Sequence, residues 1–186
     1  MNIYNQISLI TNFFLTPKLT AKKTGARDVS FLYVFTLLFI ATISFEVSKL
    51  ILYRQSKPVI AIISDSLASM IMFLIELFLF EAIVILMAAI LKKKVISRKI
   101  VYFSILAFVP SILFTPLAAL STSLGTLSSS FIWISFSVIV FYQLYLLFST
   151  IKVTLEISSL RTLFLLLSPF IILFIFLLII LAKILS

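Results

Sequence analysis

The sequence predicts an all-α fold: a polytopic, integral membrane helical bundle of about five transmembrane helices, preceded by an N-terminal amphipathic helix at the membrane surface. Of its 186 residues, 63% are hydrophobic and 11% are charged, whereas soluble domains are roughly 45–50% apolar and about 25% charged. The mean hydropathy is +1.31. The apolar residues fall into runs at least as long as the ~20 residues that a helix needs to cross a bilayer. A chain this apolar cannot cover a water-facing surface, so lipid must be its solvent.

Residues 1–28 form the first expected region, an amphipathic interfacial segment followed by a basic linker. Ile3, Ile7, Ile10 and Phe14 recur at spacings i, i+4, i+7 and i+11, which places them on one stripe of a helix. The cations of the linker follow directly, and each contributes ~1 kcal/mol near an anionic surface. We expect this helix to lie on the cytoplasmic leaflet, either as a sensor of lipid or partner or as an anchor that orients the first span.

The second expected region, residues 29–186, is a transmembrane domain. Its second apolar run exceeds the necessary length, so we expect that helix to tilt or to begin outside the hydrocarbon. The third run contains Pro110 and Pro116, which kink or interrupt helices. Such breaks mark substrate sites in some transporters, and they also occur in spans without a ligand. The five expected spans are about 29–52, 62–91, 100–120, 131–151 and 162–185.

Positive charge is distributed unevenly over the loops. Eleven of the 15 Lys and Arg residues lie in the N-terminal linker, in the loop after the second span or in the turn before the fifth. The positive-inside rule places this side in the cytoplasm, so we expect a cytoplasmic N-terminus and a C-terminus on the opposite side. The loop after the second span either contacts anionic lipid or a partner, or only fixes the orientation. Its cations are Lys92, Lys93, Lys94, Arg98 and Lys99.

Two carboxylates, Glu76 and Glu81, lie inside the second expected span. An ionised group at mid-membrane costs roughly 2.5–3.5 kcal/mol on insertion scales, so each carboxylate needs a partner, water or a proton. They are five residues apart, about 140° around a helix, and do not share a face. Glu81 lies ~15 Å from the cytoplasmic end of its span, near the bilayer centre. The pair is a candidate intramembrane polar site: either a carboxylate couples a proton or cation, or both are structural.

The residue inventory excludes several kinds of chemistry. The chain has no Cys and no His, which excludes disulfides and the usual zinc, Cys-nucleophile and Ser-His-Asp sites. We therefore expect no enzymatic activity, no metal and no cofactor. The net charge of +9 lies in short loops between apolar runs, where it sets orientation, so we expect no nucleic acid partner. Expected partners are membrane lipids and other membrane proteins or a second copy of the chain.

Several features follow one another in a distinctive order. An amphipathic lead ends near a Pro at residues 13–18 (FFLTPK), a basic turn enters the third span at residues 97–110 (SRKIVYFSILAFVP), and Trp133 stands near the start of the fourth span. This layout, which covers nearly the whole chain, resembles the Yip-domain family of small five-span membrane proteins. The chain departs from the family at residues 92–94, where three Lys stand and such proteins often have Gly.

The resemblance implies five spans, a cytoplasmic N-terminus and no catalysis. Eukaryotic members look like trafficking factors that engage Rab GTPases and shape membranes, but the N-terminal part of this chain is short, so Rab binding does not carry over. We expect a non-enzymatic membrane scaffold, adaptor or membrane-organising protein. The alternative is a transporter, or a transporter or channel subunit, that uses Glu81 and Glu76 with breaks at Pro110 and Pro116.

Overall fold

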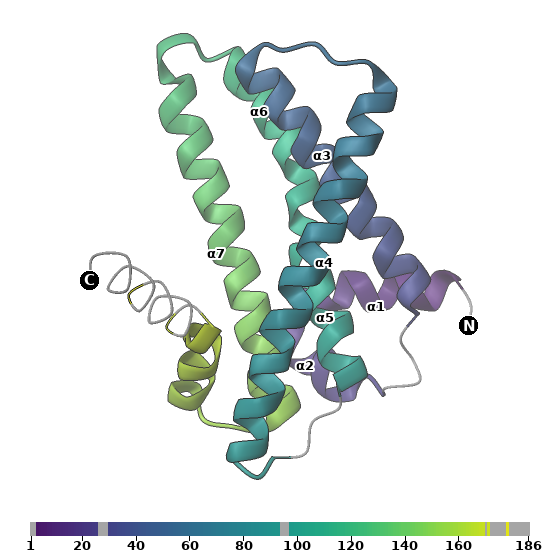
Figure 1. The fold of residues 1–186 in the computed structure, drawn as a ribbon, viewed down its shortest axis with the longest axis vertical. Coiled ribbons are helices and arrows are strands. Elements are labelled where there is room, and N and C mark those ends of the chain that lie inside the picture. Colours follow the sequence, from purple (N-terminus) through teal and green to yellow (C-terminus); the bar gives the residue numbers. More distant parts are fainter. Residues whose placement is uncertain (1–2, 26–29, 94–96, 170, 172–177, 179–186) are drawn as a thin grey trace.

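The computed structural model describes residues 3–25, 30–93, 97–169, 171 and 178, and every regular element within these residues is a helix (Figure 1). Two short helices precede the bundle, and long helices make up the rest. In chain order the helices are α1 (Ile3–Leu15), α2 (Pro17–Lys23), α3 (Phe31–Tyr53), α4 (Val59–Ile90), α5 (Ser97–Phe108), η1 (Val109–Leu113), α6 (Phe114–Thr122), η2 (Gly125–Leu127) and α7 (Ser128–Leu155), followed by an apolar helix at Ser159–Pro169.

Four helical segments in this part of the chain are long and apolar enough to cross a membrane, as in a multi-pass integral membrane protein. They are α3, α4, the combined α5–η1–α6 segment and η2–α7. The first four expected spans are therefore confirmed as helices, with boundaries shifted by a few residues. The helix Ser159–Pro169 is shorter than a span. Most of the expected fifth span, 162–185, lies outside the described residues.

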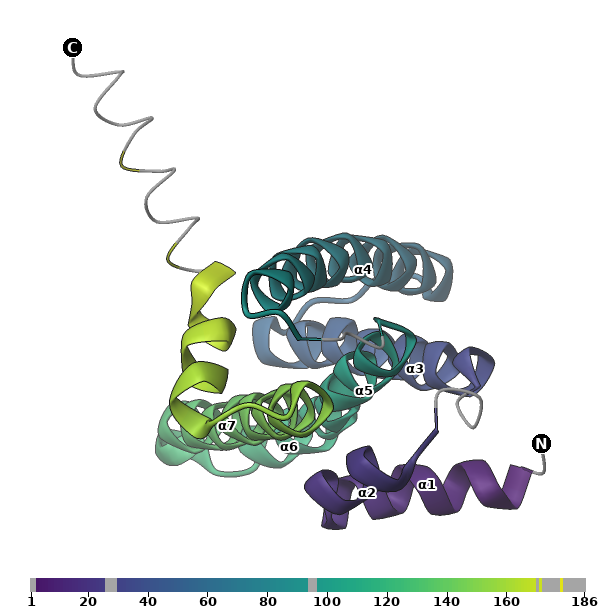
Figure 2. The ribbon, with the colours of Figure 1, turned by 90° about the horizontal axis from the view of Figure 1, so that it is seen from below.

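The broken α5–η1–α6 segment lies at the centre of the bundle. It packs against α3 on one side and α7 on the other, and α4 packs on the outside of α3 and against α5. Figure 2 shows these elements as successive layers, with α4 and α7 on opposite sides. Half of the most apolar stretch of the broken segment is buried inside the protein, against only 17% for α4. Helix α4, 32 residues long, therefore turns most of its apolar surface outward.

The two N-terminal helices pack against α5 and α7. Helix α1 runs across the long helices, not along them (Figure 1). The ring of Phe13 lies 4.8 Å from that of Phe103 on α5, and the Tyr142 hydroxyl of α7 donates to the carbonyl of Phe14 at 2.7 Å. The face of α1 that is buried includes Gln6 and Phe13. It is rotated from the expected stripe, because Ile7 is exposed.

Three long helices end in residues with left-handed backbone conformations that are not glycine, and Lys92 after α4, with φ of 54°, is one of them. Arg54 after α3 and Glu156 after α7 both have φ of 51°. In each case the next N–H closes the helix: Gln55 donates to the Leu50 carbonyl at 3.0 Å, and Ile157 donates to that of Lys152 at 3.3 Å. This hydrogen bond from one residue beyond the left-handed position is a Schellman-type end, at which glycine is preferred.

Replacing Glu156 by glycine is expected to stabilise the protein. A left-handed conformation strains a residue with a Cβ by roughly 1–2 kcal/mol, and glycine removes that strain at the cost of a more flexible unfolded chain, so we expect a gain of about 0.5–1 kcal/mol. Denaturant titration of the purified protein measures the change. Glu156→Gln is the control, because it removes the charge and keeps the Cβ; equal effects of the two substitutions would attribute the gain to charge.

Candidate functional site

The structure separates the two carboxylates of the candidate intramembrane site. Leu77, Glu81, Val84 and Ala88 form the buried stripe of α4, at spacings i, i+4, i+7 and i+11. Glu76 lies on the exposed face of the same helix. The two carboxylates therefore do not come together in one site, in agreement with their predicted angular separation. Of these two carboxylates, Glu81 is the one that points into the bundle.

Glu81 is 2% exposed and poorly compensated. Its carboxyl faces the Ser104 hydroxyl of α5, yet within the described residues neither Glu81 Oε1 nor Ser104 Oγ completes a hydrogen bond. No Lys or Arg in that part of the chain forms an ion pair with it. An ionised carboxylate would be expensive in such surroundings. The geometry therefore favours an uncharged Glu81 unless water or a cation reaches it.

The break in the central span is closed on its α7 side by Gln143. The predicted interruption at Pro110 is confirmed, since residues Val109–Leu113 form a 3-10 helix. Gln143 is buried, and its Nε2 donates to Ser111 Oγ at 2.7 Å and to the Phe108 carbonyl at 3.3 Å. An α7 side chain therefore satisfies polar groups that the irregular backbone leaves without regular helix partners.

The same break is closed on its α3 side by Ser44. Ser44 Oγ donates to the Ile112 carbonyl at 2.8 Å and accepts from the Thr115 N–H at 3.1 Å. The Thr115 hydroxyl in turn donates to the Ser44 carbonyl at 2.7 Å. Irregular backbone at membrane depth is tolerated only where protein or a water-filled cavity surrounds it. Here protein hydrogen bonds from two neighbouring helices surround it, and Pro116 causes no second break because it lies in the first turn of α6.

The basic loop residues do not form one uniform surface. Lys92 and Arg98 are exposed, and the Arg98 guanidinium lies 5.7 Å from the centre of the Phe31 ring. Lys93 donates to the Glu156 carbonyl at 3.3 Å, which joins the loop to the end of α7. Lys99 is buried, so of the five predicted contact residues it does not offer its side chain to a lipid or partner. Lys94 lies outside the described residues.

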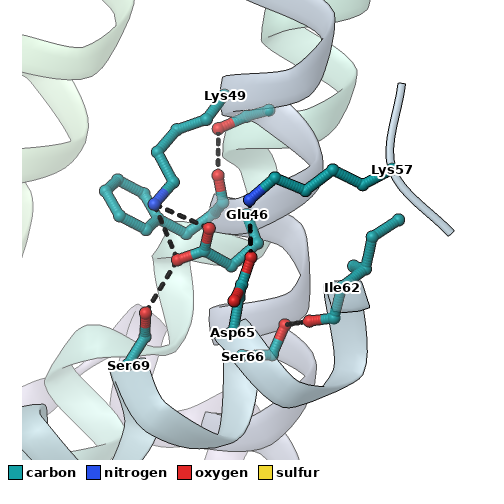
Figure 3. Close-up of polar contacts among 9 residues, drawn as sticks. Glu46, Lys49, Lys57, Ile62, Asp65, Ser66 and Ser69 are labelled. Carbon is teal, nitrogen blue, oxygen red and sulfur yellow. Dashed lines mark hydrogen bonds and ion pairs between the residues drawn. The ribbon is translucent and has the colours of Figure 1, made fainter. Parts of the chain in front are cut away.

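A polar cluster joins the C-terminal end of α3 to the N-terminal part of α4 (Figure 3). Lys49 binds both carboxylate oxygens of Glu46, at 2.6 and 2.7 Å, across the i, i+3 spacing at which side chains of a helix meet. Ser69 of α4 also donates to Glu46, at 2.7 Å. Lys57 from the connecting turn pairs with Asp65 at 2.7 Å. The Ser69–Glu46 hydrogen bond joins α4 to α3, and the Lys57–Asp65 pair joins the turn to α4. No local sequence pattern indicates either contact.

The ion pair of Lys57 makes a pH-dependent prediction. The hydrogen bond to Asp65, together with the attraction of its carboxylate, raises the pKa of the Lys57 amino group above its ordinary value. The contribution of the pair to stability is therefore complete below that ordinary value and is lost as the pH rises through the raised pKa. NMR titration of the Lys57 side chain should show the raised pKa, and Asp65→Asn should return it to the ordinary value. An identical titration in both proteins would contradict the pairing.

Glu81 lines neither of two cavities that the described residues form on the surface of the bundle. The first, about 510 Å³, is wholly apolar and lies between α7 and the helix Ser159–Pro169. The second, about 320 Å³, lies beside the polar cluster and is lined by Glu46, Lys49, Leu50, Tyr53, Gln55 and Lys57.

Across the described residues, no group of three or more acidic side chains is placed to hold a metal ion. Comparisons with protein-family models, with curated proteins and with solved structures found no match to this chain.

Proposed function

We propose that this protein is a non-enzymatic scaffold or adaptor of the membrane, which organises partners within the bilayer. The main observation behind the proposal is that neighbouring helices satisfy the polar groups at the interruption of the central span. In a transporter, a broken helix exposes its backbone to a substrate or ion. Here the groups at the break bond to Gln143 and Ser44, which leaves little for a substrate to bind. The proposal rests on this geometry and not on the resemblance in layout to the Yip-domain family.

The outward face of α4 is the proposed docking surface. Phe78 is 55% exposed, whereas the adjacent Leu77 is 4% exposed. Apolar side chains on the outward face can meet lipid or the helices of another membrane protein, where van der Waals packing drives association. The proposed partners are other membrane proteins or a second copy of the chain. We place the N-terminus in the cytoplasm and the C-terminus on the opposite side, with a fifth span at 162–185, from the distribution of positive charge and the apolar C-terminal run.

A transporter, or a transporter or channel subunit, is the second candidate function. The observation in its favour is Glu81, a carboxyl buried in the bundle with an Oε1 that has no hydrogen-bond partner among the described residues. Intramembrane carboxylates of this kind carry protons or cations in many pumps and transporters. The second carboxylate of the predicted site, Glu76, faces away from it, so a relay between the two finds no support in their placement.

Photocrosslinking tests the scaffold proposal with a matched pair of positions. A photoreactive phenylalanine analogue replaces Phe78 in one protein and Leu77 in another, and both are irradiated in their native membranes. We expect position 78 to give a discrete protein adduct, either a dimer of the chain or a complex with one partner, and position 77 to crosslink within the chain. Adducts with lipid alone at position 78 would contradict a docking role for this face.

Flux measurements on reconstituted protein test the alternative. Proteoliposomes should conduct protons and monovalent cations no faster than empty liposomes, and Glu81→Gln should leave that background unchanged. A flux that Glu81→Gln abolishes and Glu76→Gln preserves would replace the scaffold proposal with transport.

A further inference from the structure

The 320 Å³ cavity lies beside the polar cluster that Figure 3 draws, and two Lys residues are part of its lining. Lys49 and Lys57 both line it, and each of these side chains is 42% exposed. A Lys ammonium has three N–H donors, and the contacts with Glu46 and Asp65 leave donors on both for a ligand. Tyr53 and Gln55 also line the cavity, and their hydroxyl and amide groups are further donors.

The charge of this region suits an anion with one negative charge. The turn and the helix ends beside it contain three cations, Lys49, Arg54 and Lys57, and two carboxylates, Glu46 and Asp65, so this stretch of the chain carries one net positive charge. Glu46 is buried and held by Lys49 and Ser69. It therefore fixes the position of the Lys49 ammonium, as a preorganised site requires.

The position of the cavity suits a lipid headgroup. Tyr53 ends α3 and Trp133 lies in the second turn of α7, and both rings are largely exposed. These helix ends lie at the same end of the bundle, opposite the basic loop after α4 (Figure 1). Exposed Tyr and Trp rings mark the level at which the headgroups begin. Leu50 in the cavity wall supplies an apolar surface next to the donors.

We propose that this cavity binds the phosphodiester of a phospholipid headgroup in the non-cytoplasmic leaflet. The ammonium groups of Lys49 and Lys57 donate to the non-bridging phosphate oxygens, and Leu50 contacts the start of the acyl chains. The site goes beyond the proposed scaffold function, and its assignment to the non-cytoplasmic leaflet rests on the orientation proposed above.

Native mass spectrometry of the full chain in neutral detergent, titrated with phosphatidylglycerol, tests the site. Lys57→Gln should weaken binding of the first lipid about tenfold, the effect of losing one charge-assisted hydrogen bond. Lys57 is the informative position because its partner Asp65 is 41% exposed, whereas Lys49→Gln leaves the buried Glu46 without its cation. Lys22→Gln, at an exposed position of α2, is the matched control and should leave the affinity unchanged.

Competition with inorganic phosphate distinguishes a lipid from a free anion. We expect millimolar phosphate to leave the first lipid bound, because the lipid also contacts Leu50 and the membrane-facing side of the cavity. Displacement by phosphate alone would overturn the lipid source. Equal lipid affinity of the unmodified protein and Lys57→Gln, or an equal loss in Lys57→Gln and Lys22→Gln, would overturn the site.

Discussion

Replacing Phe103 by alanine is expected to lower the free energy of unfolding by about 3–5 kcal/mol. Phe103 is fully buried, and its ring lies 4.8 Å from that of Phe13 and 5.3 Å from that of Tyr102. The substitution leaves a cavity at the contact between α1 and α5, so α1 should also detach more readily from the bundle. Denaturant titration in detergent gives the stability, and limited proteolysis between α1 and α3 reports the detachment.

Phe141→Ala is the matched control for this prediction. Phe141 lies on α7 and is largely exposed, so its truncation should change the stability far less. A double-mutant cycle of Phe13→Ala with Phe103→Ala should give a coupling of about 0.5–1.5 kcal/mol, the size found for aromatic pairs. Additive effects of the two substitutions would contradict the packing of α1 on α5.

Replacing Glu81 by leucine is expected to raise the stability by about 1–3 kcal/mol, because an apolar side chain of similar length removes a poorly satisfied buried polar group. Glu81→Lys should destabilise the protein strongly, since a longer cation would be buried without a partner. The free energy of unfolding of both variants, measured in the same detergent, checks the pair of predictions.

Glu76→Leu is the control for the second prediction. Glu76 lies on the exposed face of α4, so its substitution should change the stability by no more than about 0.5 kcal/mol. A loss of stability in Glu81→Leu would show that the carboxyl makes a necessary contact, such as a hydrogen bond with Ser104 or with an internal water.

Apolar run length correctly predicted the first four spans as helices, because the requirement to span a bilayer acts on each segment separately. The third span illustrates the limit of that argument. Pro110 predicted the break, since proline lacks the N–H that a helix needs. The sequence could not show that Ser44 and Thr115 close it, because Ser and Thr in helices commonly bond to their own preceding carbonyls. Nor could it show that Gln143 reaches Ser111 and the Phe108 carbonyl, because these residues lie 32 and 35 positions away on another helix.

The charged residues were predicted less well, because their surroundings depend on contacts between distant segments. Lys99 was grouped with the exposed loop cations, yet helix α5 turns it inward. Lys57 and Asp65 lie eight residues apart on either side of Pro58, which ends the turn, so no helical spacing relates them. The angular separation of Glu76 and Glu81 was predictable because both lie on one regular helix, whose geometry fixes which residue can face inward.

Cysteine scanning of α4 tests most directly the claim that the bundle is closed around Glu81. The chain has no Cys, so each introduced thiol reports alone. Leu77→Cys, Val84→Cys and Ala88→Cys sample the buried stripe, Phe78→Cys samples the outward face, and Gln55→Cys in the exposed turn is the positive control. In intact membranes, we expect a small water-soluble maleimide to label only position 55. Labelling at 77, 84 and 88 without labelling at 78 would reveal an aqueous path beside Glu81 and contradict the closed bundle.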